Sequence, residues 1–163
     1  MIAIDTNVLV RLLTGDHPVQ SKASHTLFAS EDIYIPDTVL LETEWVLRAA
    51  FDLTPDEICT ALRRVCGLRN VTVSDGQLVA LVIDWHEAGF DFADAFHLAL
   101  SRGQEAMKTF DADFIKKAKK LTDRRVQRPP VFLPPSSTVP APHRYPQKKK
   151  SNATPAPPLA EER

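Results

Sequence analysis

The chain has no long uninterrupted apolar run, few glycines and only two cysteines. Charged residues interrupt its apolar stretches well before the roughly 20 residues that a membrane helix needs. Residues 1–5 also lack the basic-then-apolar plan of a signal peptide. We therefore expect a soluble cytoplasmic protein. Because there is no Gly-rich phosphate loop and no Gly-Lys-Ser or Gly-Lys-Thr, no nucleotide cofactor is expected either.

Cysteine and histidine are too sparse for a thiolate or imidazole metal motif. Cys59 and Cys66 lie in one helical pattern without His or Cys neighbours at zinc spacing, so we expect buried, reduced thiols. The histidines show no consistent spacing and are His17, His25, His86, His97 and His143. His97 lies one turn from Asp94, and we predict a residue of the helix surface or pocket wall there rather than a general base.

Charge and proline divide the chain in two. Residues 1–126 contain 14 basic and 19 acidic residues, a net charge of -5, whereas residues 127–163 contain 6 and 2, a net charge of +4. Ten of the 13 prolines lie from Pro129 onward. We predict one folded domain over 1–126 and a disordered, proline-rich basic tail over 127–163. Its three lysines, 148–150, are typical of a solvated extension, with RNA phosphates as the alternative contact.

Short apolar strands alternate with amphipathic helices in residues 1–126, which predicts an α/β domain with a mainly parallel sheet. Strands are predicted at residues 2–4, 33–35, 71–73 and 106–110. Helices are predicted at residues 7–13, 18–29, 37–51, 54–66, 75–87, 93–102 and 112–120. Thr54 before Pro55 gives one distinct helix start, because threonine caps a helix and proline suits its first turn.

Acidic residues follow the predicted strands. Asp5 and Asp111 each come directly after a strand and before a helix, at the edge where open parallel sheets gather ligands. Aspartate is also a good helix N-cap, and Asp94, three residues after Asp91, fits a capping arrangement as well. From position alone, capping and ligand binding remain equally open for these aspartates.

Glu42 is harder to explain as a structural residue. On a helical wheel it lies in the middle of an apolar face. That face is formed by Val39, Trp45, Val46 and Ala49. A core-facing carboxylate is costly without a cation, so this position favours a metal-facing role. Glu44 projects near Arg48 one turn on, where an exposed ion pair accounts for it. Trp45 and Trp85 are predicted core residues.

Four carboxylates in one pocket would suit a hard divalent cation such as Mg²⁺ or Mn²⁺. Without the ion they would repel one another and raise each other's pKa, so the site should gain stability from the metal. No activated nucleophile accompanies these acids. The pattern therefore indicates phosphodiester hydrolysis by a metal-activated water.

Four segments, in the same order, resemble those of the PIN-domain ribonucleases, specifically the VapC-type toxins of bacterial type II toxin-antitoxin modules. They are residues 1–9 (MIAIDTNVL), 42–47 (ETEWVL), 92–95 (FADA) and 109–114 (TFDADF). Each segment alone is weakly specific, whereas four in order are specific. The resemblance covers roughly residues 1–126 and leaves the tail unmatched.

The resemblance implies a three-layer α/β/α sandwich with one metal site. The ligands it implies for Mg²⁺ or Mn²⁺ are Asp5, Glu42, Asp94 and Asp111. Asn7 and Thr109 would orient these carboxylates by hydrogen bonds. Asp113 is a further candidate ligand, through water or at lower occupancy, whereas Asp91 is explained equally well as a cap or as an additional acid of the site.

The same resemblance implies endonucleolytic cleavage of RNA to a 5′-phosphate and a 3′-hydroxyl, a VapB-like antitoxin as partner, and a homodimer. Basic residues that could contact phosphate at the rim are Arg11, Lys22, Arg48, Arg63, Arg64 and Arg69.

Three alternatives belong to other functional classes. A receiver-type signalling domain would need an acidic pair after its first strand, but Asp5 is the sole acid there. A phosphatase with an aspartyl nucleophile would need a second aspartate at position 7, which is Asn7. The third alternative, a PIN-fold protein that binds RNA or a partner without cutting, is disfavoured because all four acids are present.

Overall fold

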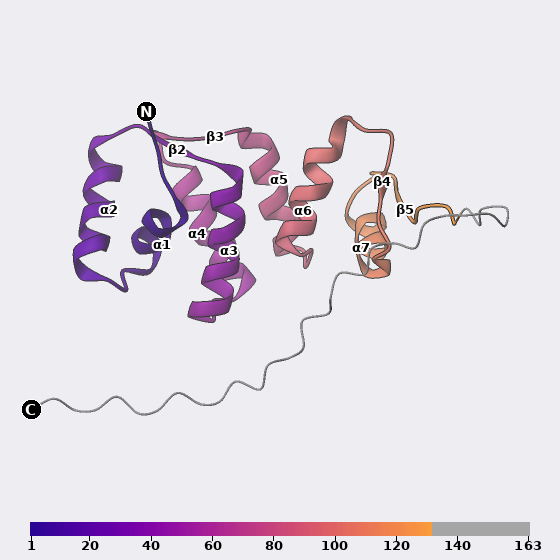
Figure 1. Ribbon diagram of the computed structural model, residues 1–163, viewed down its shortest axis with the longest axis horizontal. Coiled ribbons are helices and arrows are strands. Elements are labelled where there is room, and N and C mark those ends of the chain that lie inside the picture. The colour runs from indigo at the N-terminus through magenta and orange to yellow at the C-terminus, as the bar shows by residue number, and fades with distance from the viewer. Residues whose placement is uncertain (132–163) are drawn as a thin grey trace, which may run out of the picture. The chain divides into compact units, whose positions relative to one another are not determined.

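The structure, a computed structural model, describes residues 1–131 of the chain (Figure 1). Residues Met1–Pro129 form one compact unit. Most of the tail predicted over 127–163 lies outside the described residues. Within residues 1–131, no helix combines the length and the apolar character needed to cross a membrane.

All strand pairs are parallel, which confirms the predicted α/β class. Strands β1 (Ile2–Ala3), β2 (Ile33–Ile35) and β3 (Val71–Val73) form a sheet in the order β1-β2-β3. Strand β2 lies in the middle, and the side chains of Ile33 and Ile35 are fully buried. As in other parallel sheets, the connections between these strands are helical.

A second parallel pair stands apart from this sheet. Strand β4 (Met107–Lys108) pairs with β5 (Val126–Gln127), and the N–H groups of Met107 and Thr109 donate to the carbonyls of Arg125 and Gln127. Strand β5 was not predicted from the sequence. The parallel strands of residues 1–131 are therefore divided between two sheets, β1-β2-β3 and β4-β5.

The helices begin and end close to the predicted residues. They are α1 (Thr6–Thr14), α2 (Pro18–Ser30), α3 (Asp37–Phe51), α4 (Pro55–Cys66), α5 (Gly76–Glu87), α6 (Phe92–Leu100) and α7 (Ala112–Leu121). Helix α4 starts with a capping box, in which the Thr54 N–H donates to the Glu57 carboxylate at 2.8 Å. Helix α1 ends at Gly15, whose φ of 67° is a left-handed conformation that glycine adopts without strain. Helix α6 is shorter than predicted because residues Ser101–Gly103 form a 3₁₀ turn.

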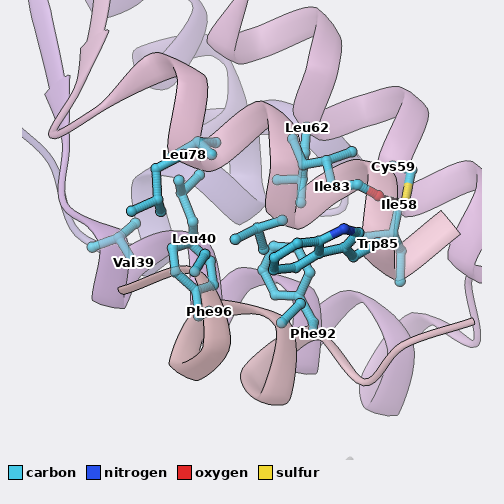
Figure 2. Close-up of a cluster of buried hydrophobic side chains, with 14 of the residues drawn as sticks. Val39, Leu40, Ile58, Cys59, Leu62, Leu78, Ile83, Trp85, Phe92 and Phe96 are labelled. Carbon is cyan, nitrogen blue, oxygen red and sulfur yellow. Dashed lines mark hydrogen bonds between the residues drawn. The ribbon is translucent and has the colours of Figure 1, made fainter. Parts of the chain in front are cut away.

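The hydrophobic core includes side chains from α3, α4, α5 and α6 (Figure 2). Trp85 is buried, as predicted, and Phe92 packs edge-to-face on Phe96. The buried Cys59 thiol donates to the Ile83 carbonyl at 3.6 Å. Burial raises the pKa of Cys59 and of the half-buried Cys66 to about 11, so both free cysteines are weakly reactive thiols.

Helix α3 turns a different face to the core from the one predicted. Its buried residues are Val39, Leu40, Thr43, Glu44 and Leu47. Glu44 is only 3% exposed, whereas Trp45 is 58% exposed. The predictions of an exposed Glu44 and a buried Trp45 are therefore wrong, as is the core-facing position of Glu42, which is exposed. The physical reason is that α3 is apolar on nearly all sides, so periodicity alone does not select its inner face.

We expect the core between α4 and α5 to dominate stability. Leu62→Ala should lower the free energy of unfolding by about 2–5 kcal/mol, because it leaves a cavity at a fully buried position. The matched control is Leu81→Ala on α5, where the leucine is 40% exposed and the loss should be less than half as large. Urea unfolding followed by circular dichroism measures both losses. Equal losses would contradict this assignment of the core.

Candidate functional site

Asp5 and Glu42 lie at one pocket, between the N-terminal half of α1 and α3. Asp5 caps α1, and its Oδ1 accepts a hydrogen bond from the Val8 N–H at 3.0 Å. The buried Thr6 hydroxyl donates to Oε2 of Glu42 at 2.5 Å. Both acids, together with Asn7, line a pocket of about 390 Å³. Thr6 therefore fixes the carboxylate of Glu42 beside the start of α1.

The role of Thr6 was missed in the sequence. The sequence shows only a threonine between Asp5 and Asn7. Nothing in the spacing of the chain indicates that its hydroxyl contacts a residue 36 positions away. Asn7, predicted to orient the carboxylates, is exposed and lines the same pocket.

Asp94 and Asp111 belong to a second acidic group at the starts of α6 and α7. Asp111 caps α7 through Oδ1, which accepts from the N–H groups of Asp113 and Phe114 at 2.8 and 3.0 Å. The Thr109 hydroxyl accepts from the Asp111 N–H at 3.0 Å, so Thr109 contacts the backbone of Asp111, whereas the prediction was a hydrogen bond to a carboxylate.

Asp91 caps α6 in the same manner, with Oδ1 accepting from the Ala93 and Asp94 N–H groups at 3.0 and 3.2 Å. Burial raises the pKa of Asp94, and the negative charges of Asp91 and Asp111 raise it further. At Asp94, the two neighbouring negative charges act in the direction expected of like charges, in addition to the larger effect of burial.

The structure brings the four predicted ligands together as two groups rather than one cage. Within residues 1–131, no three His, Cys, Asp or Glu side chains lie close enough to hold a metal ion together. Asp113 is exposed in the first turn of α7. The donor chemistry of the Asp5–Glu42 pair nevertheless fits Mg²⁺, which commonly takes one or two carboxylates and completes its shell with water and phosphate oxygens. The cap on α1 uses only one oxygen of Asp5.

Glu44, the buried carboxylate of α3, has a structural explanation. The Arg48 guanidinium donates to its two oxygens at 2.7 and 3.4 Å. The Nε2 atom of the buried His86 lies 3.7 Å from Oε1 of Glu44, while Nδ1 of His86 is 2.8 Å from the Phe90 carbonyl oxygen. The Arg48 partner offsets the cost of burying this charge inside the domain.

The basic residues predicted for the rim have different surroundings. Arg11 lines the pocket of Asp5 and Glu42 and pairs with Asp16. Arg63 instead lies on α4 and is bound to Asp84 and Glu87, both at 2.7 Å. Its charge is compensated there, so it is not a free phosphate contact. His97 is exposed, in accordance with the surface position predicted for it.

Comparison with known proteins places this chain in a family. The PIN domain family model matches residues 2–120, and the chain belongs to that family. Its fold is accordingly the PIN-like α/β/α sandwich with parallel strands. Among solved structures, the chain is similar to the crystal structure of Mycobacterium tuberculosis VapC20, a sarcin-ricin loop cleaving toxin. The two are 21% identical, with 77% of this chain and 99% of that chain covered and a TM-score of 0.37. No curated protein matches.

Asp94→Asn should stabilise the metal-free protein at neutral pH. The raised pKa of Asp94 means that ionising this carboxyl is less favourable in the folded than in the unfolded chain. The unchanged protein therefore loses stability relative to the variant as the pH rises through the folded pKa of Asp94. Below the unfolded pKa, about 3.9, that difference disappears.

Thermal unfolding in EDTA over a range of pH measures this effect. Asp5→Asn is the matched control, because asparagine also caps helices and Asp5 is outside the Asp94 group. A melting temperature that fell for Asp94→Asn at neutral pH would show that the carboxylates do not repel one another.

Proposed function

We propose that this protein is a metal-dependent endoribonuclease and acts as the toxin of a toxin-antitoxin pair. The observation that carries the proposal is the Asp5–Glu42 pocket, with its Thr6 hydrogen bond, in a chain of the PIN domain family. PIN-domain nucleases generally use divalent metals, and carboxylate oxygens are the ligands that Mg²⁺ and Mn²⁺ prefer.

Asp5 and Glu42 would hold the cation. Asp94 and Asp111, which form a separate carboxylate group in the structure, would contribute further negative charge to the same active site. A bound divalent cation lowers the pKa of a water ligand and neutralises charge on a phosphate. The Thr6 hydroxyl keeps Oε2 of Glu42 in place, and Thr109 supports the turn that presents Asp111. Asn7, which lines the same pocket, would donate a hydrogen bond to substrate or carboxylate.

The proposed reaction is hydrolysis of an internal phosphodiester bond. The oxygen of a water molecule bonds to phosphorus, and the bond from phosphorus to O3′ breaks. The leaving O3′ takes a proton, which gives a 3′-hydroxyl and a 5′-phosphate. What the residues of this chain contribute is a fixed arrangement of negative charge and hydrogen-bond donors around that centre.

The biological setting proposed here comes from the resemblance to VapC-type toxins. The protein would act in the cytoplasm, form a homodimer, and be restrained by a VapB-like antitoxin that covers the acidic pocket. We also propose that residues 1–126 constitute the nuclease domain and 127–163 an accessory tail.

Cleavage of an RNA pool by the purified full chain tests the proposal. With Mg²⁺ or Mn²⁺ we expect cutting, and with EDTA none. Asp5→Asn should reduce the rate at least about 100-fold, because a metal ligand contributes several kcal/mol to the transition state. Asparagine retains the α1 cap, so the variant should fold. Glu105→Gln, an exposed position outside the Asp5 pocket, is the charge-matched control and should cut normally.

One result would replace this proposal with another. If the unchanged chain and Asp5→Asn were equally inactive on every RNA class while both were folded and bound Mn²⁺, the protein would be a PIN-fold binding module that does not cut.

A further inference from the structure

We infer that Trp45 is the stacking platform for an unpaired base of the RNA substrate, next to the scissile phosphate. The inference rests on the proposed function and adds to it the feature of RNA that is recognised. It assigns a role to the aromatic side chain that α3 leaves outside the core.

The first observation is the exposure and setting of Trp45. Its side chain is 58% exposed, whereas Trp85 is 8% exposed in the core. Trp45 lines a pocket of about 420 Å³, a volume in the usual range of small-molecule sites. The other residues that line it are Thr38, Leu41, Glu42, Glu44, Arg48, Asp91 and Ala93. A pocket of this size, with an exposed indole in its lining, can accommodate one flat base.

The second observation is that this pocket adjoins both carboxylate groups. Glu42 lies one helical turn before Trp45 and lines this pocket as well as that of Asp5. Asp91 and Ala93 also line the Trp45 pocket, and they lie three residues and one residue before Asp94 at the start of α6. A base on Trp45 would therefore belong to a nucleotide whose phosphate lies at the candidate metal ligands.

The charged side chains of this pocket are three carboxylates, Glu42, Glu44 and Asp91, and one guanidinium, Arg48, so a phosphate there needs a bound cation or a free donor of Arg48. The buried Glu44 is paired with Arg48, which uses Nε and Nη2 for its hydrogen bonds. Among the described residues, Nη1 of Arg48 has no hydrogen-bond partner, and the side chain is 45% exposed. The guanidinium is thus held rigidly by one carboxylate while a donor remains for a phosphate oxygen.

These features favour single-stranded RNA over a duplex. Bases in a duplex stack on each other, so their faces are not available, whereas an unpaired base can stack on an aromatic side chain. Every base has such a face, and each base–aromatic contact in single-strand binding proteins contributes about 1–3 kcal/mol. The platform would thus select for unpaired nucleotides with little regard to base identity.

Intrinsic fluorescence of the full chain tests the inference. The chain has two tryptophans, so Trp85→Phe leaves Trp45 as the sole indole. Asp5→Asn in the same protein prevents cutting during a titration. A short oligoadenylate with Mg²⁺ should quench the Trp45 emission, whereas a duplex of similar length should not.

Affinity measured by fluorescence anisotropy of labelled oligoadenylate gives the second readout. In the Asp5→Asn background, Trp45→Leu should weaken binding roughly 10-fold or more, and Trp45→Phe should retain most of it. Val19→Ala, at an apolar α2 position that is 75% exposed, is the matched control and should bind as the background does. Circular dichroism of each variant verifies the fold.

The outcomes separate this inference from the proposed nuclease. If the unchanged chain cuts RNA but Trp45→Leu neither lowers affinity nor changes cutting, the platform is wrong while the nuclease stands. If Trp45→Leu turns a dimer into a monomer by light scattering without changing RNA affinity, this face binds a second copy, and the inference is overturned. Binding that depends on Trp45 without any cutting by the unchanged chain would leave Trp45 as an RNA-binding residue, but it would reject the nuclease and, with it, the position of Trp45 next to a scissile phosphate.

Discussion

The orientation of α3 about its own axis, which decides which of its faces is buried, is the constraint on which the rest of the structure depends. Leu40 and Leu47 are fully buried, and their burial turns Glu44 into the protein as well. A carboxylate in that position is tolerated because Arg48 binds it and because His86 lies beside it. Once this face is fixed inward, Glu42 is directed to Thr6 and Trp45 to solvent.

Much of the fold could be predicted from local sequence. The capping box at Thr54, the left-handed Gly15 and the short β-branched strands are signals that depend on neighbouring residues, so the helix and strand limits agree closely with the structure. Strand β5 could not be predicted in this way. Two residues are too few to show the alternating apolar pattern of a strand. They form a strand because they pair with β4, 19 residues earlier in the chain.

The candidate site was predictable in composition but not in arrangement. Aspartates after strands and a glutamate in α3 are visible in the sequence, and the N-cap alternative proved correct for Asp5, Asp91 and Asp111. Whether a cap is also a ligand is a question of three-dimensional proximity, which spacing does not contain. The division into an Asp5–Glu42 pair and an Asp94–Asp111 group, and the contact of Thr6 with Glu42, both result from how separate helices pack.

The caps on α1, α6 and α7 have a consequence for the protein without its ion. The aligned peptide dipoles of a helix place about half a positive elementary charge at its N-terminus. Three of these helix ends lie at the carboxylates of Asp5, Asp91 and Asp111, so the backbone acts as a permanent counter-charge. Without a bound cation, these carboxylates therefore form a partly neutralised surface rather than a bare cluster of anions. If the proposed cation binds there, it would meet acids that are already held in the folded chain, and its binding would be separable from folding.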